Sequence, residues 1–208
     1  DLHCYLSDPV PAVYQGLPGV EQIKQPGDTI PEHDTVVLLD MSRVSRAGSL
    51  ESLINRYWDQ SNVILIDHHL DEAPEGKVGF IDAGYAATAE IMMDLFEAAE
   101  LPITEAVVHC IYVGQITDTG GYRFSNTNAR SHQMAASLHE TGLDTAAIFD
   151  HIFGSIPRRK FELLRRILHI TAFALDDSIA YVGERQQDYA DSGATREDLD
   201  GIINHLMH

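Results

Sequence analysis

Two aliphatic runs that each end in an acid place the strongest constraint on how this chain can fold. The runs are "TVVLLD" at 35–40 and "NVILID" at 62–67, and the second is followed directly by His68 and His69. Runs of this length and composition are typical of buried strands, and the stretch 49–58 between them has apolar residues at helical spacing. This order predicts a βαβ unit with parallel strands, so that both acids lie at the same edge of a sheet.

The rest of the chain repeats this alternation of short aliphatic runs and longer amphipathic stretches. It predicts an α/β fold with a mainly parallel sheet flanked by helices, followed by a connecting helix and the start of a second α/β domain. The expected first strand covers 2–6, and further helices are expected at 88–99, 104–116, 128–141, 144–153 and 157–175. A strand at 178–184 and a helix from Thr195 indicate the second domain. A basic block at 158–166, "RRKFELLRR", is interpreted as a solvated helix face or an interdomain spacer.

Composition and charge narrow the classes of protein and partner. Only Cys4 and Cys110 are present, without CxxC spacing, which argues against a disulfide framework or a cysteine zinc site and predicts a cytoplasmic protein. No apolar stretch is long enough to suggest a membrane helix. A net charge of -18 disfavours binding to long duplex nucleic acid, whose affinity depends on lysine and arginine. An anionic ligand should therefore be small and held locally.

Acids and imidazoles gather at the ends of three predicted elements. Asp40 ends one strand, Asp67 ends the next with His68 and His69 after it, and Asp118 follows a predicted helix in "DTGG". Successive side chains of an extended segment point in opposite directions, so one histidine can bind a metal while the other faces a substrate. Asp67 is placed to orient an imidazole. The two carboxylates of Asp40 and Asp118 with the imidazole of His68 suit Mn²⁺, Mg²⁺ or Fe²⁺.

When Asp40 and Asp118 are considered one at a time, a structural role is the alternative to metal binding. For Asp40 alone, the alternative is a turn residue or a helix N-cap. Asp118 alone reads as an Asx turn that closes its helix before Gly120 and Gly121. The triplet at 67–69 is harder to explain as a polar turn, because polar groups at the end of a buried strand need partners.

These residues carry a family resemblance. "IDHH" after a strand, an earlier strand ending in "LLD", and the later "GQITDTGGYRFSNT" resemble the DHH phosphoesterase superfamily, in particular its bacterial nanoRNase and 3'-phosphoadenosine-5'-phosphate phosphatase branch. The resemblance implies a DHH phosphoesterase domain at 1–155, a connecting helix at 156–175 and the start of the DHH-associated substrate domain at 176–208. It also implies a metal-dependent hydrolase of short oligoribonucleotides, 3'-phosphoadenosine 5'-phosphate, or both.

The same resemblance implies a role for individual residues. Asp40 matches an aspartate that bridges two metal ions, Mn²⁺ or Mg²⁺. His68 matches the histidine ligand, and Asp118 matches the aspartate ligand of the second ion. His69 matches the histidine that faces the scissile phosphate, with Asp67 orienting, so these two are expected to be catalytic. Arg123 in "YRF" is expected to contact phosphate, although a surface ion pair is the alternative. The partner is expected to be a small phosphorylated nucleotide or a short oligonucleotide, and the helices from 128 onward offer a face for a homodimer.

The family's first motif, a histidine followed by a DxD pair, and its glycine-rich, histidine-containing motif do not occur in the chain. We therefore expect a fragment of a longer protein, with at most one weakly bound ion and little turnover by itself. Two alternatives stay open: a nucleotide-binding module that does not cleave, and a DHH relative that acts on pyrophosphate, polyphosphate, cyclic dinucleotides or single-stranded DNA.

Overall fold

A computed structural model describes residues 1–27, 33–41, 43–58, 62–70, 78–154, 156–176, 178–199 and 201–202. Within it the chain divides into two compact units, residues 1–152 and 153–208. The assignment of 1–155, 156–175 and 176–208 to a DHH domain, a connecting helix and the start of a substrate domain stays a prediction.

A three-stranded parallel sheet forms the centre of the first unit. Its strands are β3 (Thr35–Leu39), β4 (Asn62–Asp67) and β5 (Val78–Ile81), in the order β3-β4-β5. The predicted strands at 35–40 and 62–67 are confirmed, and the backbone N–H of Asp40 extends the ladder by donating to Ile66 O at 2.9 Å. The third strand was missed, because it is only four residues long and contains Gly79. The predicted α/β fold with a parallel sheet is therefore confirmed.

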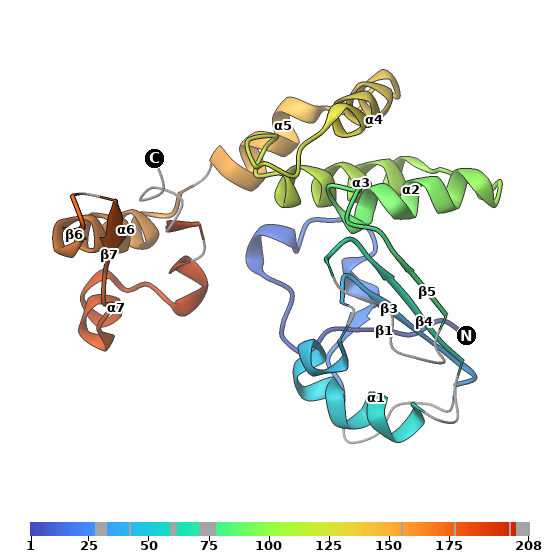
Figure 1. Ribbon diagram of the computed structural model, residues 1–208, viewed down its shortest axis with the longest axis horizontal. Helices are drawn as coiled ribbons and strands as arrows, with labels where there is room; N and C mark the ends of the chain where they lie inside the picture. Colours follow the sequence, from blue (N-terminus) through green and yellow to red (C-terminus); the bar gives the residue numbers. More distant parts are fainter. Residues whose placement is uncertain are drawn as a thin grey trace. The chain divides into compact units, whose positions relative to one another are not determined.

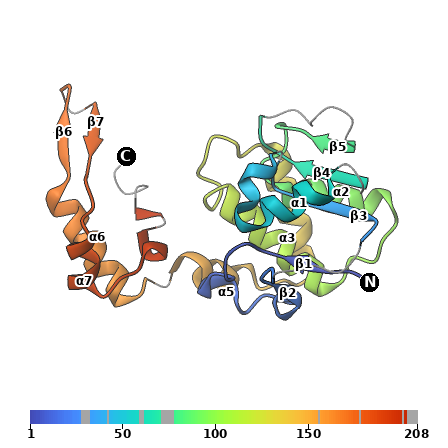
Figure 2. The same ribbon diagram turned by 90° about the horizontal axis from the view of Figure 1, so that it is seen from below.

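Helices cover both faces of this sheet, so that the unit has three layers (Figures 1 and 2). One face packs against α1 (Glu51–Tyr57) and the 3-10 segment Val44–Leu50 that precedes it. The core on that side consists of Leu38, Ala47, Ile54, Val63 and Leu65. The other face lies under α2 (Thr88–Ala98) and α3 (Glu105–Asp118).

A second apolar core holds the helical layer of the first unit together. It joins α2 and α3 to α4 (Ala129–Glu140) and α5 (Thr145–Phe149). Its buried members are Met93, Val108, Ile111, Tyr112, Val113, Ile116, Leu138 and Ile148. Beyond α5 the chain makes one π-helical turn, Asp150–Gly154, where a continuous helix at 144–153 was predicted. This core fixes α3, whose last residue is Asp118, relative to the helices around it.

The predicted strand at 2–6 is shorter in the structure and does not join the main sheet. It is β1 (Cys4–Tyr5), which pairs in parallel with β2 (Ile23–Lys24). Two 3-10 turns, Ala12–Tyr14 and Val20–Gln22, lie between these strands. Proline and glycine in this segment leave room only for such short elements.

The second unit is built around α6 (Arg158–Ile170), whose Leu163 and Ile167 are fully buried against Ala194 and Ile202. The unit also contains β6 (Ala172–Ala174), β7 (Ile179–Tyr181), α7 (Gln186–Ser192) and a 3-10 turn at Arg196–Leu199. The basic block lies on α6, and three of its arginines make ion pairs inside this unit. The pairs are Arg159 with Asp198, Arg165 with Glu162 and Arg166 with Asp191.

The predicted helix at 157–175 was wrong beyond Ile170. After that residue the chain forms an antiparallel hairpin, in which β6 pairs with β7. Leu175 and Asp176 both have positive φ, which reverses the chain where a helix would continue. The helix predicted from Thr195 is a 3-10 turn as far as Leu199, and residues 203–208 of that prediction lie outside the described residues. Among the described helices, none is both long enough and apolar enough to span a membrane.

Candidate metal centre

Asp40 lies at the carboxyl end of β3, next to the end of β4 where Asp67 lies. Its φ of 60° turns the backbone sharply out of the strand, a conformation that aspartate adopts more readily than most residues. The hydroxyl of Thr88, the first residue of α2, donates to Asp40 Oδ1 at 2.8 Å. About half of the Asp40 side chain (52%) stays exposed, so the carboxylate is held in place and also accessible.

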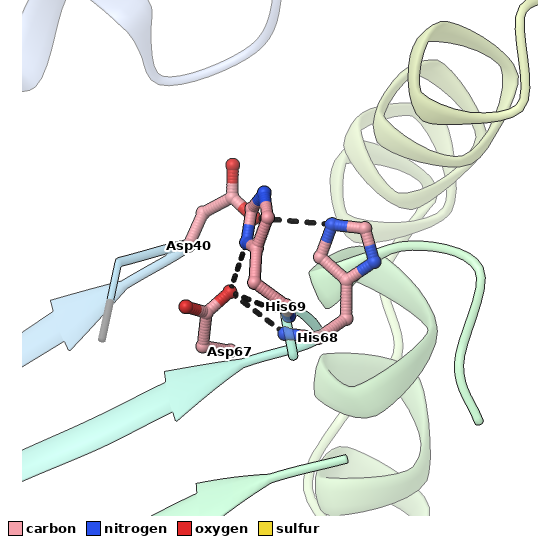
Figure 3. A group of neighbouring side chains, drawn as sticks. All are labelled: Asp40, Asp67, His68 and His69. Carbon is pink, nitrogen blue, oxygen red and sulfur yellow. Dashed lines mark hydrogen bonds and ion pairs between the residues drawn. The ribbon is translucent and has the colours of Figure 1, made fainter. Parts of the chain in front are cut away.

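Asp67 is fully buried and organises the two histidines after it. Its Oδ1 accepts the backbone N–H of His68 at 2.7 Å and of His69 at 3.2 Å, and it lies 2.6 Å from Nδ1 of the His69 ring (Figure 3). Burial raises the pKa of the Asp67 carboxyl, but the hydrogen bonds from His69 and His68 outweigh it, so the pKa lies below its ordinary value of 3.8. Asp67 is therefore an ionised acceptor that holds the backbone of both histidines and the ring of His69.

His68 lies between the carboxyl ends of β3 and α3. Its Nε2 lies 3.5 Å from Asp40 Oδ1 and 3.6 Å from Asp118 Oδ2, although Asp118 ends α3 and is 50 residues further along the chain. Its Nδ1 lies 3.3 Å from the backbone carbonyl of Tyr85. A carbonyl only accepts, so this contact calls for a proton on Nδ1, while Nε2 faces two carboxylates that attract either a proton or a cation to that position.

The donor atoms fit a hard or borderline cation. Adjacent ligand atoms of an octahedral ion lie about 3 Å apart when its bonds are about 2.1 Å long, and the distances from His68 to Asp40 and Asp118 are close to that. Donor atoms of Asp40, Asp67, His68 and His69 also all lie within 4.8 Å of one another. Oδ1 of Asp67 already accepts three N–H groups, so we favour Asp40, His68 and Asp118 as the set that could hold an ion.

The raised pKa of Asp118 also supports this set of ligands. Burial and then the charge of Asp40 raise its pKa from 3.8 to about 6, and the nearby imidazoles only partly offset this. Two carboxylates that converge on one imidazole repel each other when both are ionised. A bound cation would remove that repulsion, which is the behaviour expected of a ligand pair.

His69 lies beside Asp40 and His68, and one of its ring nitrogens is already bonded to Asp67. Its Nδ1 is held by Asp67, and its ring centre lies 4.6 Å from that of His68. The side chain is partly exposed, and Nε2 is the ring nitrogen not used by Asp67. A histidine oriented by a buried carboxylate is suited to transfer protons.

The structure places Arg123 in the turn after α3. Its Nε donates to Gly120 O at 3.0 Å, so part of the guanidinium holds the turn. Gly120 has a φ of 56°, and a Cβ there would lie 2.5 Å from the ring of Phe124, so this turn needs glycine. The role of Arg123 in substrate binding stays a prediction, as do the roles of the other site residues.

The sequence reasoning missed two groups that contact the site. Thr88 begins a helix and carries no special pattern, and its contact with Asp40 depends on how α2 packs. The Tyr85 carbonyl that faces His68 belongs to the backbone, so no residue type could have revealed it.

Comparison with known proteins identifies relatives of the chain and a shared fold. No family model matched the sequence. A Thermus thermophilus protein named bifunctional oligoribonuclease and PAP phosphatase NrnA is 30% identical over 169 residues, which cover 81% of this chain and 49% of that protein. A Bacillus subtilis protein of the same name is 26% identical over 101 residues, covering 47% of this chain and 32% of that protein. The predicted resemblance to the nanoRNase and 3'-phosphoadenosine-5'-phosphate phosphatase branch of the DHH superfamily is therefore confirmed. The chain spans about half the length of the Thermus protein and about a third of the length of the Bacillus protein.

A solved structure agrees on the fold. An exopolyphosphatase-related protein from Bacteroides fragilis superposes with a TM-score of 0.86 over 99% of this chain and 62% of that protein, at 19% identity. At this identity the likeness shows that the fold is shared. The chain thus has both a sequence match and a fold match along most of its length.

Proposed function

We propose that this chain carries the metal-binding part of a hydrolase that cleaves phosphoesters in short oligoribonucleotides, in 3'-phosphoadenosine 5'-phosphate, or in both. The observation that carries the proposal is the convergence of Asp40 Oδ1 and Asp118 Oδ2 on Nε2 of His68. The names of the relatives support the substrate class. Oxygen and imidazole donors without cysteine favour Mn²⁺ or Mg²⁺ as the ion.

In this proposal Asp40, His68 and Asp118 hold a cation. When bound, the ion would supply Lewis-acid polarisation of a phosphoryl oxygen and would activate water for attack on phosphorus. His69 would transfer a proton at its Nε2, because Asp67 holds its Nδ1 and stabilises the charged imidazolium. Hydrolysis forms a bond between the water oxygen and phosphorus and breaks the bond between phosphorus and the leaving oxygen, and in this proposal His69 takes a proton from the water or protonates the leaving oxygen.

The charge distribution favours a small anionic substrate. Residues 153–208 contain 7 of the 14 lysines and arginines but 9 of the 32 acids, so the net charge of -18 resides mostly in residues 1–152. A long polyanion would be repelled by that surface, whereas a nucleotide can be held at one ion. Arg123, exposed in the turn after α3, is the proposed additional contact to phosphate.

The test uses the full-length protein that contains this chain. Release of mononucleotides from a diribonucleotide, and of phosphate from 3'-phosphoadenosine 5'-phosphate, is measured with Mn²⁺, with Mg²⁺ and with EDTA. We expect His68→Ala to abolish both activities, while His169→Ala, which removes an exposed imidazole at the end of α6, leaves them intact.

Absence of turnover with either ion, or unchanged turnover after His68→Ala, would contradict the proposal. Mn²⁺-dependent binding of these nucleotides without hydrolysis would instead support the binding module that does not cleave.

A further inference from the structure

The segment between β5 and α2, residues 82–87 with sequence "DAGYAA", lies against the candidate metal centre. The carbonyl of Tyr85 in this segment faces Nδ1 of His68 at 3.3 Å. This carbonyl favours a proton on Nδ1 and so leaves Nε2 as the nitrogen that can bind a cation. What holds the segment therefore bears directly on the ability of His68 to bind an ion.

Two asparagines hold the carbonyls on either side of that of Tyr85. Nδ2 of Asn128 donates to Gly84 O at 3.1 Å, and Nδ2 of Asn126 donates to Ala86 O at 2.8 Å. The peptide plane that carries the Tyr85 carbonyl lies between the two planes fixed in this way. Because the backbone has only two soft torsions per residue, restraining both neighbours restrains the plane between them.

Asn126 also ties the segment to the third member of the donor set. The same Nδ2 donates to the backbone carbonyl of Asp118 at 3.0 Å, so one amide joins Ala86 to the end of α3. Asn128 has a second task, because its Oδ1 accepts the backbone N–H of Ser131 and caps α4. In both residues the side-chain amide N–H groups donate to backbone carbonyls. A carboxylate could not replace them, because it has no N–H to donate.

We infer that Asn126 and Asn128 are positioning residues of the metal centre: together they aim the Tyr85 carbonyl at Nδ1 of His68 and thereby keep Nε2 directed at Asp40 and Asp118, where it can bind a cation. This inference deepens the proposed function and rests on it. Neither asparagine is placed to touch the substrate or the ion in this account. They act through a backbone carbonyl and through the end of α3.

The test compares three single variants and the double variant Asn126→Ala/Asn128→Asp with the wild-type chain. Asn128→Asp keeps an oxygen to cap α4 but loses the donor to Gly84, and Asn126→Ala loses both of its donations. Asn55→Asp makes the same amide-to-carboxylate change on the exposed surface of α1 and serves as the control. Mn²⁺ affinity is measured by calorimetry, and the tautomer of His68 in metal-free protein is measured from the ¹⁵N shifts of its ring.

We expect the wild-type and Asn55→Asp proteins to show His68 with its proton on Nδ1. Each site variant should show a mixture of tautomers and Mn²⁺ binding about 10- to 100-fold weaker, as is common when groups behind a metal ligand are removed. The two losses should combine to less than the product of the single effects, because both asparagines aim the same carbonyl.

Wild-type tautomer and wild-type Mn²⁺ affinity in both variants would overturn the inference, and so would strictly independent effects in the double variant. If Asn126→Ala fails to fold, Asn128→Asp still decides the matter, because it retains the cap. If the wild-type protein binds no Mn²⁺, the proposed function fails, while the tautomer of His68 in the variants still tests the positioning separately.

Discussion

Replacing Asp118 by asparagine tests the electrostatic account of the candidate metal centre without reference to catalysis. Burial and the charge of Asp40 raise the pKa of Asp118 from 3.8 to about 6. At pH 7 the carboxyl is ionised in both the folded and the unfolded chain. The charge is less favourable in the folded chain, so it lowers the free energy of unfolding. The rise corresponds to about 3 kcal/mol at about 1.36 kcal/mol for each pKa unit. Because the side chain is 34% exposed, solvent screening reduces this to roughly 1–2 kcal/mol.

The sign of the pH dependence follows from the direction of the pKa change. The folded protein holds its Asp118 proton to higher pH than the unfolded chain does, so the stability of the wild-type protein falls as pH rises from about 4 to about 6. Asparagine has no such proton to lose. In EDTA, the Asp118→Asn protein should therefore be more stable than wild type at pH 7, and the advantage should shrink to a few tenths of a kcal/mol near pH 4.

Thermal unfolding in EDTA at several pH values measures this advantage, which amounts to about 2–8 °C at neutral pH for a unit of this size. Asp34→Asn, which removes an exposed carboxylate just before β3, is the matched control. With Mn²⁺ in excess the order should reverse, because a ligand that binds only the folded state stabilises it and the variant has a neutral amide oxygen in place of a charged carboxylate donor. A variant less stable than wild type in EDTA at pH 7, or an advantage equal at pH 4 and pH 7, would refute this reasoning.

Three further substitutions probe other parts of the structure. Asp40→Asn should weaken Mn²⁺ binding in calorimetry at least tenfold without lowering the unfolding temperature in EDTA; unchanged affinity would remove Asp40 from the donor set. His69→Gln should lower kcat of the full-length enzyme by about 10²–10⁴ and leave Mn²⁺ affinity near wild type, whereas an equal loss of both would make His69 a ligand. Gly114→Val should lower the free energy of unfolding by about 1–3 kcal/mol in denaturant titrations, because a Cβ at Gly114 would lie 2.7 Å from the Cβ of Ala89. An unchanged midpoint would show that α2 and α3 can separate freely.

The parts of the fold that could be predicted are those where sequence pattern and long-range packing agree. β3 and β4 are aliphatic runs that end in an acid, and parallel pairing leaves both acids at one edge. Their side-by-side arrangement therefore followed from topology. β5 and β6 have four residues or fewer, too short to show a period, and pairing with a neighbour decides their conformation, whereas β7 lies within the strand predicted at 178–184.

The environment of the site was less accessible to prediction, because backbone groups and helix packing build it. The carbonyl of Tyr85 behind His68 carries no side-chain signal, and Asn126 and Asn128 look like ordinary turn residues in "YRFSNTNAR". The same chemistry that favours asparagine in turns, an amide that bonds to backbone, here connects two segments about 40 residues apart. Local pattern could not distinguish these two uses.

Asp118 shows why two interpretations of one motif stayed open at the level of sequence. "DTGG" closes a helix whether or not its aspartate binds anything, and the N–H of Gly121 does donate back to Ile116 O at 2.7 Å. What makes Asp118 part of the site is the position of α3, which Gly114 allows to pack closely on Ala89 of α2. Since α2 also supplies Thr88 to Asp40, the two carboxylates that face His68 are positioned through contacts of the same helix. A substitution that separates α2 from α3 should therefore act on the donor distances as well as on stability, even though it touches no donor.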